Sequence, residues 1–166
     1  MRVLNIHFRD FHRSPAAVGG LIDTLASDND QLWPGENWPP MRFPGGLRVG
    51  AEGGHGPIRY RVEAHEPQRS VRFRFLAPVG FEGFHEFRAM ETTAGMARLE
   101  HRIEMQLTGA AVFQWTLMIR ALHDALLEDS LNRAAIALGC PAVARPWSRR
   151  VRALRWALSR RKAKRG

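Results

Sequence analysis

Fifty consecutive residues of this 166-residue chain alternate apolar and polar side chains, and the next thirty residues change to a helical period. Between Ile58 and Leu107, four successive segments place apolar residues at every second position, the pattern of strands with one buried face. Residues 110–138 then carry an apolar stripe along one side of a helix. An antiparallel sheet with one apolar face covers that face. The sequence therefore predicts an α+β fold, in which one long helix closes a curved sheet.

The alternation assigns an inward face to each of the four segments. The inward positions are apolar or small, apart from two histidines, and the outward positions are mostly Arg and Glu, with Phe84 as an exception. The inward set comprises Ile58, Tyr60, Val62, Ala64, Val71, Phe73, Phe75, Phe81, Gly83, His85, Phe87, Ala89, Ala97, Leu99, His101, Ile103, Met105 and Leu107.

The chain before residue 58 is less regular. Residues 2–11 alternate loosely and predict a first strand, with Leu4, Ile6 and Phe8 set against Asn5, His7 and Arg9. Ser14-Pro15 is a strong helix start, so a helix is expected over 15–26, weakened by Gly19-Gly20. Residues 28–46 predict a Trp- and Pro-rich loop, residues 47–52 a second strand, and residues 53–56 a flexible glycine-rich end to that strand.

The long helix has recognisable ends. Thr108 is the expected N-cap, and Gly139 followed by Pro141 marks the C-terminus. A single uninterrupted helix of this length spans ~43 Å, enough to cross the sheet. Its predicted apolar stripe consists of Val112, Trp115, Ile119, Leu122, Leu126 and Leu127, and the opposite face carries Gln114, Asp124, Glu128 and Asn132.

This order of elements resembles the START-like superfamily, which includes the birch-pollen-allergen fold and the polyketide cyclase/dehydrase and lipid-transport proteins. The likeness covers residues 2–139 and includes the helix opening Ser14-Pro15-Ala16-Ala17-Val18. It implies a helix-grip domain over 1–139 with a ligand cavity between sheet and helix. The superfamily has no universal catalytic signature and contains both carriers and enzymes, so the fold leaves binding and catalysis open.

Three histidines occupy positions where the pattern calls for apolar side chains: His85, His101 and His123. Strand parity places His101 opposite His85 or Phe87. Two inward imidazoles would depress each other's protonation, and either is a candidate general base. The alternative is that each is a core residue hydrogen-bonded to a neighbour. The full predicted ligand-binding set is His85, His101, His123, Trp115, Phe87, Ile119, Tyr60, Phe73 and Ile103.

The Trp33 and Trp38 region forms either a lid over the cavity mouth or a plug at one end of the core. No metal site and no cofactor are expected, because no carboxylate or cysteine shares the inward faces at suitable spacing. The glycine run at 53–56 fits no phosphate-binding fingerprint, and no nucleophile elbow or zinc-protease motif is present. The single Cys140 excludes an internal disulfide, and the N-terminus lacks an apolar h-region, so a cytoplasmic location is expected.

Residues 140–166 are expected to form a separate basic tail. Positions 145–166 carry ten Arg or Lys and no acid, whereas residues 1–144 hold 15 basic against 16 acidic residues. Trp147, Val151, Leu154 and Leu158 form a narrow apolar stripe on a helix otherwise covered by arginine. Such a helix suits an anionic membrane surface, with Trp147, Arg149, Arg150 and Arg152 as contact residues. Nucleic acid has less support because no base-reading motif is present, and docking on the body by the stripe is the alternative.

Three hypotheses follow from the sequence. The first is a module that binds a small hydrophobic or aromatic molecule between sheet and helix. The second is a cyclase- or dehydratase-like enzyme in which His85 or His101 removes a proton alpha to a carbonyl. The third is a peripheral membrane or nucleic-acid partner that acts through its basic tail.

Overall fold

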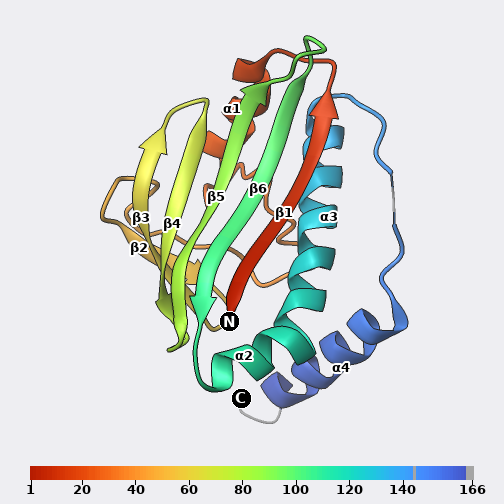
Figure 1. Cartoon of the computed structure of the whole chain (residues 1–166). Helices are drawn as coiled ribbons and strands as arrows, with labels where there is room; N and C mark the ends of the chain where they lie inside the picture. The colour runs from red at the N-terminus through yellow and green to blue at the C-terminus, as the bar shows by residue number, and fades with distance from the viewer. Residues whose placement is uncertain (144, 164–166) are drawn as a thin grey trace.

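The computed structural model describes residues 1–143 and 145–163 and shows an antiparallel sheet wrapped around one long helix (Figure 1). Six strands form one sheet in the order β1-β6-β5-β4-β3-β2. They are β1 (Arg2–Phe11), β2 (Glu52–His55), β3 (Ile58–Glu66), β4 (Ser70–Ala77), β5 (Phe81–Glu91) and β6 (Ala97–Leu107). The helical segments are α1 (Pro15–Asp23), α2 (Ala110–Gln114), the π-helical turn η1 (Trp115–Ile119), α3 (Arg120–Ala137) and α4 (Arg149–Ala163).

The meander from β3 to β6 confirms the predicted strands and, apart from Ala64, their inward faces. The inward position predicted for Ala64 is wrong, because the register of β3 against β4 shifts between Val62 and Ala64 and leaves Ala64 exposed. Tyr60, Val62, Val71, Phe73 and Phe87 are fully buried. Phe87 pairs with His101 across β5 and β6, one of the two registers that parity allowed. The outward face carries ion pairs such as Arg72–Glu86 at 3.1 Å. Phe84, which breaks the pattern, packs under the Arg72 guanidinium at 4.3 Å from its ring centre.

The segments α2, η1 and α3 join into one long helix, called the grip helix below, which covers the concave face of the sheet (Figure 1). The predicted C-terminus is confirmed: the Gly139 and Cys140 N–H groups donate to the carbonyls of Ile136 and Ala135, a Schellman closure. The predicted N-cap is wrong, because Gly109 holds that position with φ +54°. The helix is also not uniformly α-helical, since five residues near its start widen into a π turn.

The middle of strand β1 turns its apolar side chains away from the core, whereas Val3 and Phe11 near its two ends are buried. Leu4, Ile6 and Phe8 are 56%, 42% and 50% exposed, whereas the inward side chains are those of Asn5, His7 and Arg9. Alternation predicts that a strand has two faces, but it does not say which face the register of an edge strand will bury. The inner face of the sheet is consequently apolar over β3 to β6 and polar along β1.

The predicted boundaries of the second strand are wrong. Residues 47–51 form turns, and β2 lies on the glycine run instead. The strand forms on the glycines because another part of the backbone lies close to them: the N–H and C=O groups of Gly54 pair with those of Arg42. A Cβ on Gly53 would lie 2.2 Å from the Arg42 carbonyl oxygen. Glycine therefore permits a strand pairing that a side chain would block.

Helix α1 begins as predicted, with the Ser14 hydroxyl accepting from the Ala17 N–H at 3.2 Å. It ends at Asp23, three residues earlier than expected. Its two glycines have different surroundings. A Cβ on Gly19 would lie 1.7 Å from the Gln68 carbonyl oxygen in the β3–β4 turn, whereas a Cβ on Gly20 would meet nothing within 4 Å.

Trp33 and Trp38 are buried and pack in the same core as α1 and α3, so the loop plugs one end of the domain. The Trp33 indole N–H donates to the Pro39 carbonyl at 3.0 Å, and the Trp38 indole N–H donates to the Asp129 carboxylate at 2.7 Å. Among the described residues, no helix combines the length and apolar character that a membrane span requires.

The two glycines of α1 give a matched pair of substitutions. We expect Gly19→Ala to destabilise the domain by about 2 kcal/mol or more, because the new methyl group meets backbone rather than a movable side chain. Gly20→Ala is expected to be neutral or to stabilise by up to about 1 kcal/mol through helix propensity. Urea unfolding of both variants measures the difference, and equal effects would contradict the close approach of α1 to the β3–β4 turn.

Candidate functional site

A row of five imidazole rings and one phenol ring crosses the interior between the sheet and the grip helix. It consists of His55, Tyr60, His85, His101, His123 and His7, and is called the histidine layer below. Successive ring centres along this row are 5.7, 4.6, 5.4, 5.1 and 6.1 Å apart. The layer runs from β2 and β3 at one side of the sheet to β1 at the other.

The structure brings the three predicted histidines together. His85 on β5 and His101 on β6 are 5% and 2% exposed, and His85 Nδ1 lies 3.2 Å from His101 Nε2. His123 reaches them from the first turn of α3. Strand parity determines the first two positions and the helical stripe the third, which is why the sequence located all three.

Most of the other predicted residues surround this layer. The rings of Phe73 and Phe87 lie 4.9 Å from His85 and 4.6 Å from His101, respectively. Trp115 lies 5.9 Å from His123 and packs with Ile103 and Ile119 in a second, smaller apolar cluster. The main core lies on the other side, so the polar rings separate two apolar clusters.

Several ring nitrogens of the layer have no hydrogen-bond partner among the described residues. These are Nε2 of His85, Nδ1 of His101 and Nδ1 of His123. Because a buried polar atom without a partner costs about 1–3 kcal/mol, three of them in one place are unusual in a core that serves only for stability. The other end of the layer is satisfied, since His55 Nδ1 and the Tyr60 hydroxyl form a short hydrogen bond.

Burial keeps the inner histidines neutral. It lowers the pKa of His85 and of His101 well below 6.5, and neighbouring imidazoles lower both further. Burial, His123 and Arg59 together lower the pKa of His55 to about 3. At the outer end the balance changes: burial lowers the pKa of His7, but hydrogen bonds to Asp124 and Glu128 outweigh this and raise it. The layer therefore joins neutral imidazoles inside to a protonatable one at the edge.

The outer end of the layer forms a polar seam between β1 and α3. Asn5 Nδ2 donates to Asp124 Oδ1 at 3.0 Å, and the His7 ring lies 3.1 Å from Asp124 and 3.4 Å from Glu128. Arg9 donates to the side chain of Asn132 at 2.6 Å.

Asp124, Glu128 and Asn132 thus pack against the sheet edge, and their expected position on the solvent face of the helix is wrong. The inverted face of β1 is the reason, because its polar side chains offer partners to a polar strip of the helix. Sequence reasoning missed His7, His55 and Asp124. The sequence did contain a signal for His7, because it alternates with Leu4, Ile6 and Phe8 on the first strand. Such an alternation allows either of the two faces of a strand to be buried.

Part of the basic tail docks on the body. Val151 is buried, and the Trp147 indole N–H donates to Asp129 at 3.0 Å. The Arg155 guanidinium stacks over the Trp147 ring at 4.1 Å. Arg150 Nη2 donates to the carbonyls of Thr116 and Leu117 at 3.2 and 2.8 Å, on the π turn of the grip helix. The tail therefore contacts the π turn of the grip helix. Residues 144 and 164–166 of the predicted tail lie outside the described residues.

Surface hollows occur at the flanks of α3. One, of about 450 Å³, lies between the loop at 29–37 and the end of α3. Another, of about 310 Å³, lies between α3 and the segment 145–151. Neither lies between the sheet and the grip helix, where the rings of the histidine layer and their phenyl neighbours occupy the space.

The buried histidines make stability depend on pH. Below about pH 6.5 the unfolded chain takes up protons that the buried imidazoles do not, so stability is complete near neutrality and falls as the pH falls. His55, with a pKa of about 3, contributes a loss of about 2 kcal/mol between pH 7 and 5. His7 acts in the opposite direction.

We therefore expect the unfolding temperature to fall by several degrees over this range. The fall should be smaller in His55→Gln and unchanged in His12→Gln, whose side chain is exposed. Thermal unfolding followed by circular dichroism at several pH values checks this. A stability that does not change from pH 7 to 5 would contradict the buried placement.

Comparison with known proteins shows likeness in structure alone. No protein-family model matches the chain, and no curated protein matches it in sequence. Norcoclaurine synthase from Thalictrum flavum, solved with dopamine and hydroxybenzaldehyde, has a TM-score of 0.62 at 12% identity, with 86% of this chain and 90% of that chain covered. The Bacillus cereus protein XoxI has a TM-score of 0.58 at 17% identity and coverages of 81% and 94%. Ara h 8.0201 has a TM-score of 0.55 at 12% identity and coverages of 84% and 99%. The chain shares with these solved structures the helix-grip fold, an antiparallel sheet around one long helix, as the order of its elements predicts.

Proposed function

We propose that this protein binds a small, largely apolar molecule with a hydrogen-bonding group between the sheet and the grip helix. The unpartnered ring nitrogens of His85 and His101 are the observation that carries the proposal. A bound hydroxyl, carbonyl or amine group next to these rings removes the cost of leaving them unsatisfied. The phenyl rings of Phe73 and Phe87 and the indole of Trp115 supply an apolar surround for the rest of the molecule.

Entry requires movement, because rings fill this space in the present structure. The π turn at Trp115–Ile119 is the element suited to move, since π-helical turns interrupt regular hydrogen bonding and are frequent at functional sites. Its buried Trp115 side chain faces the site, whereas Leu117 on the same turn is 64% exposed. Outward displacement of this turn opens the interior without disturbing the sheet.

An aromatic ligand suits the site better than a flexible chain. The surrounding rings are stacked, tilted or T-shaped at centre distances of 4.6–5.4 Å, which is the spacing at which aromatic groups pack favourably. The structural neighbour norcoclaurine synthase was solved with two small aromatic molecules, dopamine and hydroxybenzaldehyde. That likeness supports the choice of probe.

Binding is better supported than proton abstraction. A general base works best when its pKa lies near the working pH, whereas burial and neighbouring imidazoles lower the pKa of His85 and of His101 well below 6.5. Neutral imidazoles of this kind orient a ligand by hydrogen bonds. They accept protons from carbon acids poorly, and this favours a carrier or sensor over a cyclase-like enzyme.

Hydroxybenzaldehyde is a suitable first probe. Titration should shift the ring ¹⁵N resonances of His85 and His101 in the tag-free full chain, because their unpartnered nitrogens gain a hydrogen bond. His101→Phe should weaken binding about tenfold, the equivalent of one lost hydrogen bond, whereas the exposed His12→Gln should not change it. Native mass spectrometry of the purified protein adds a search for a bound molecule. Ring resonances that stay unchanged, together with the absence of a co-purified molecule, would contradict the proposal.

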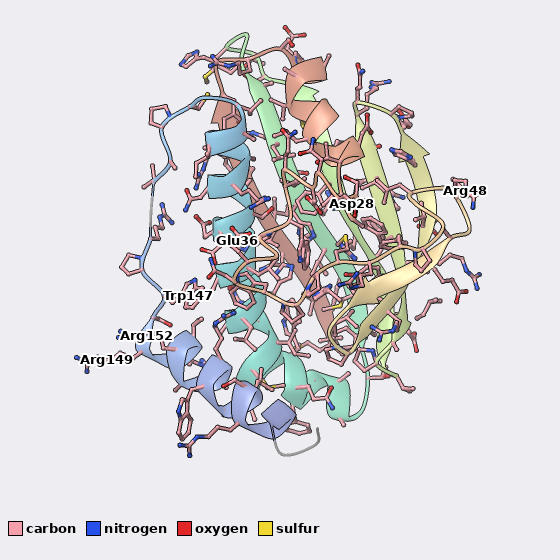
Figure 2. All side chains as sticks on the ribbon, turned by 180° about the vertical axis from the view of Figure 1, so that it is seen from behind. Asp28, Glu36, Arg48, Trp147, Arg149 and Arg152 are labelled. Carbon is pink, nitrogen blue, oxygen red and sulfur yellow. The ribbon has the colours of Figure 1, made fainter. Side chains whose placement is uncertain are left out.

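A second candidate function, association with anionic membrane surfaces, is favoured by the outer side of α4. Trp156 is 59% exposed on the same face of the helix as Arg149, Arg152 and Arg160, and no acidic residue occurs on the helix. Figure 2 shows Arg149 and Arg152 projecting away from the body, whereas Trp147 lies beside α3. Exposed apolar side chains flanked by arginines are typical of helices that lie in a lipid interface.

Charge reversal separates membrane binding through this surface from general electrostatics. We expect Arg149→Glu with Arg152→Glu to weaken binding to phosphatidylserine-containing vesicles at least about tenfold, since each arginine near such a surface contributes about 1 kcal/mol. The control is Arg48→Glu with Arg69→Glu, two exposed arginines elsewhere that give the same net charge. Equal losses in both double variants, or retention on DNA rather than on vesicles, would overturn the membrane role.

A further inference from the structure

We propose that His7, His123 and Asp124 form a binding site for a divalent transition-metal ion at the outer end of the histidine layer. One ligand atom from each residue lies within 4.8 Å of the other two. The set has two imidazoles and one carboxylate, a combination common among three-ligand sites for zinc and related ions. The site is distinct from the proposed small-molecule site and does not depend on it.

The distances fit an ion placed between the three side chains. Asp124 Oδ1 lies 3.1 Å from His7 Nε2 and 3.7 Å from His123 Nδ1. Ligand atoms about 2 Å from a tetrahedral zinc ion are themselves about 3.3 Å apart, so small side-chain shifts complete the geometry. The ion would replace the proton now shared between His7 and Asp124, and that proton would pass to solvent.

A separate observation on His123 points to a missing ligand. Its Nδ1 atom is buried and has no hydrogen-bond partner among the described residues, because 3.7 Å to Asp124 is too long for a hydrogen bond. This nitrogen faces the same carboxylate oxygen that His7 contacts. A metal ion uses such a lone pair directly, whereas a structural histidine would have been expected to find a partner.

The surroundings supply the supporting contacts that metal sites need. His7 Nδ1, the nitrogen turned away from the ion, lies 3.4 Å from Glu128 Oε1, an arrangement that fixes the ring and its tautomer. Asn5 Nδ2 holds Asp124 Oδ1 at 3.0 Å. These two contacts preorganise one imidazole and the carboxylate before any ion arrives.

The site is accessible and has room for a further ligand. The side chains of His7 and His123 are each 16% exposed, and that of Asp124 is 37% exposed, so the carboxylate end faces solvent. Arg120 lies 3.9 Å from the other Asp124 oxygen, but its side chain is 66% exposed and free to turn away. Three protein ligands with a solvent-facing fourth position are typical of sites where a metal binds water or substrate.

Titration of the tag-free, chelator-treated full chain with zinc and cobalt chlorides tests the proposal. We expect one ion per chain by calorimetry, and a cobalt absorption spectrum of four-coordinate character. Asp124→Asn and His7→Gln should weaken binding at least about a hundredfold, and Glu128→Gln about 10–100-fold through the supporting contact. His65→Gln is the matched control, because His65 and Asp23 form a similar pair at 3.1 Å that has no third ligand in the described part of the chain.

Histidine ring NMR of the wild-type protein keeps the test independent of variant folding. Zinc should shift the ring resonances of His7 and His123 and leave those of His12 and His65 in place. Absence of one-to-one binding for both ions would overturn the site, as would binding that survives both Asp124→Asn and His7→Gln. Hydroxybenzaldehyde binding is scored separately on His85 and His101, so failure of one proposal does not decide the other.

Discussion

The inner face of the sheet is apolar in one part and polar in another, and the helix that covers it has to match both parts. Strands β3 to β6 present an apolar inner face, whereas β1 presents Asn5, His7 and Arg9 at the edge. One helix covers both regions, so it must be apolar where it crosses the meander and polar where it meets β1. Leu126 and Leu127 meet the first need, and Asp124 and Glu128 meet the second. The histidine layer crosses both regions, from His55 on β2 to His7 on β1.

The layer has an energetic cost that packing does not repay by itself. Its rings divide the core into two apolar clusters and leave three ring nitrogens without partners in the described structure. An all-apolar layer would pack the same space without that cost. Retaining imidazoles there is understandable if something binds to them, either a polar group of a small molecule inside or a metal ion at the edge. Trp115 on the π turn of the grip helix lies 5.9 Å from His123 of this layer, and Arg150 donates to a carbonyl of the same turn.

Much of the fold was predictable from patterns of local origin. Alternation located β3 to β6 and their inward faces, and the Gly139 signal located the end of the grip helix. The same alternation explains why His85 and His101 were predicted to lie side by side. Predictions failed where a distant partner decided the outcome: β2 formed on glycines that approach Arg42, and β1 buried its polar face. Gly19 was expected only to weaken a helix, but it permits the contact with Gln68.

The order of strands and helix, the α+β class and the three inward histidines follow from local patterns in the sequence, because side-chain period depends only on local backbone geometry. The meeting of His7, His123 and Asp124 is a result of tertiary packing, since these residues come from a sheet edge and a helix more than a hundred positions apart. Tertiary packing also decides that the tail docks on the π turn through Arg150. The physical reason is that the pairing of an edge strand with a covering helix depends on which face is buried, and no local pattern records that choice.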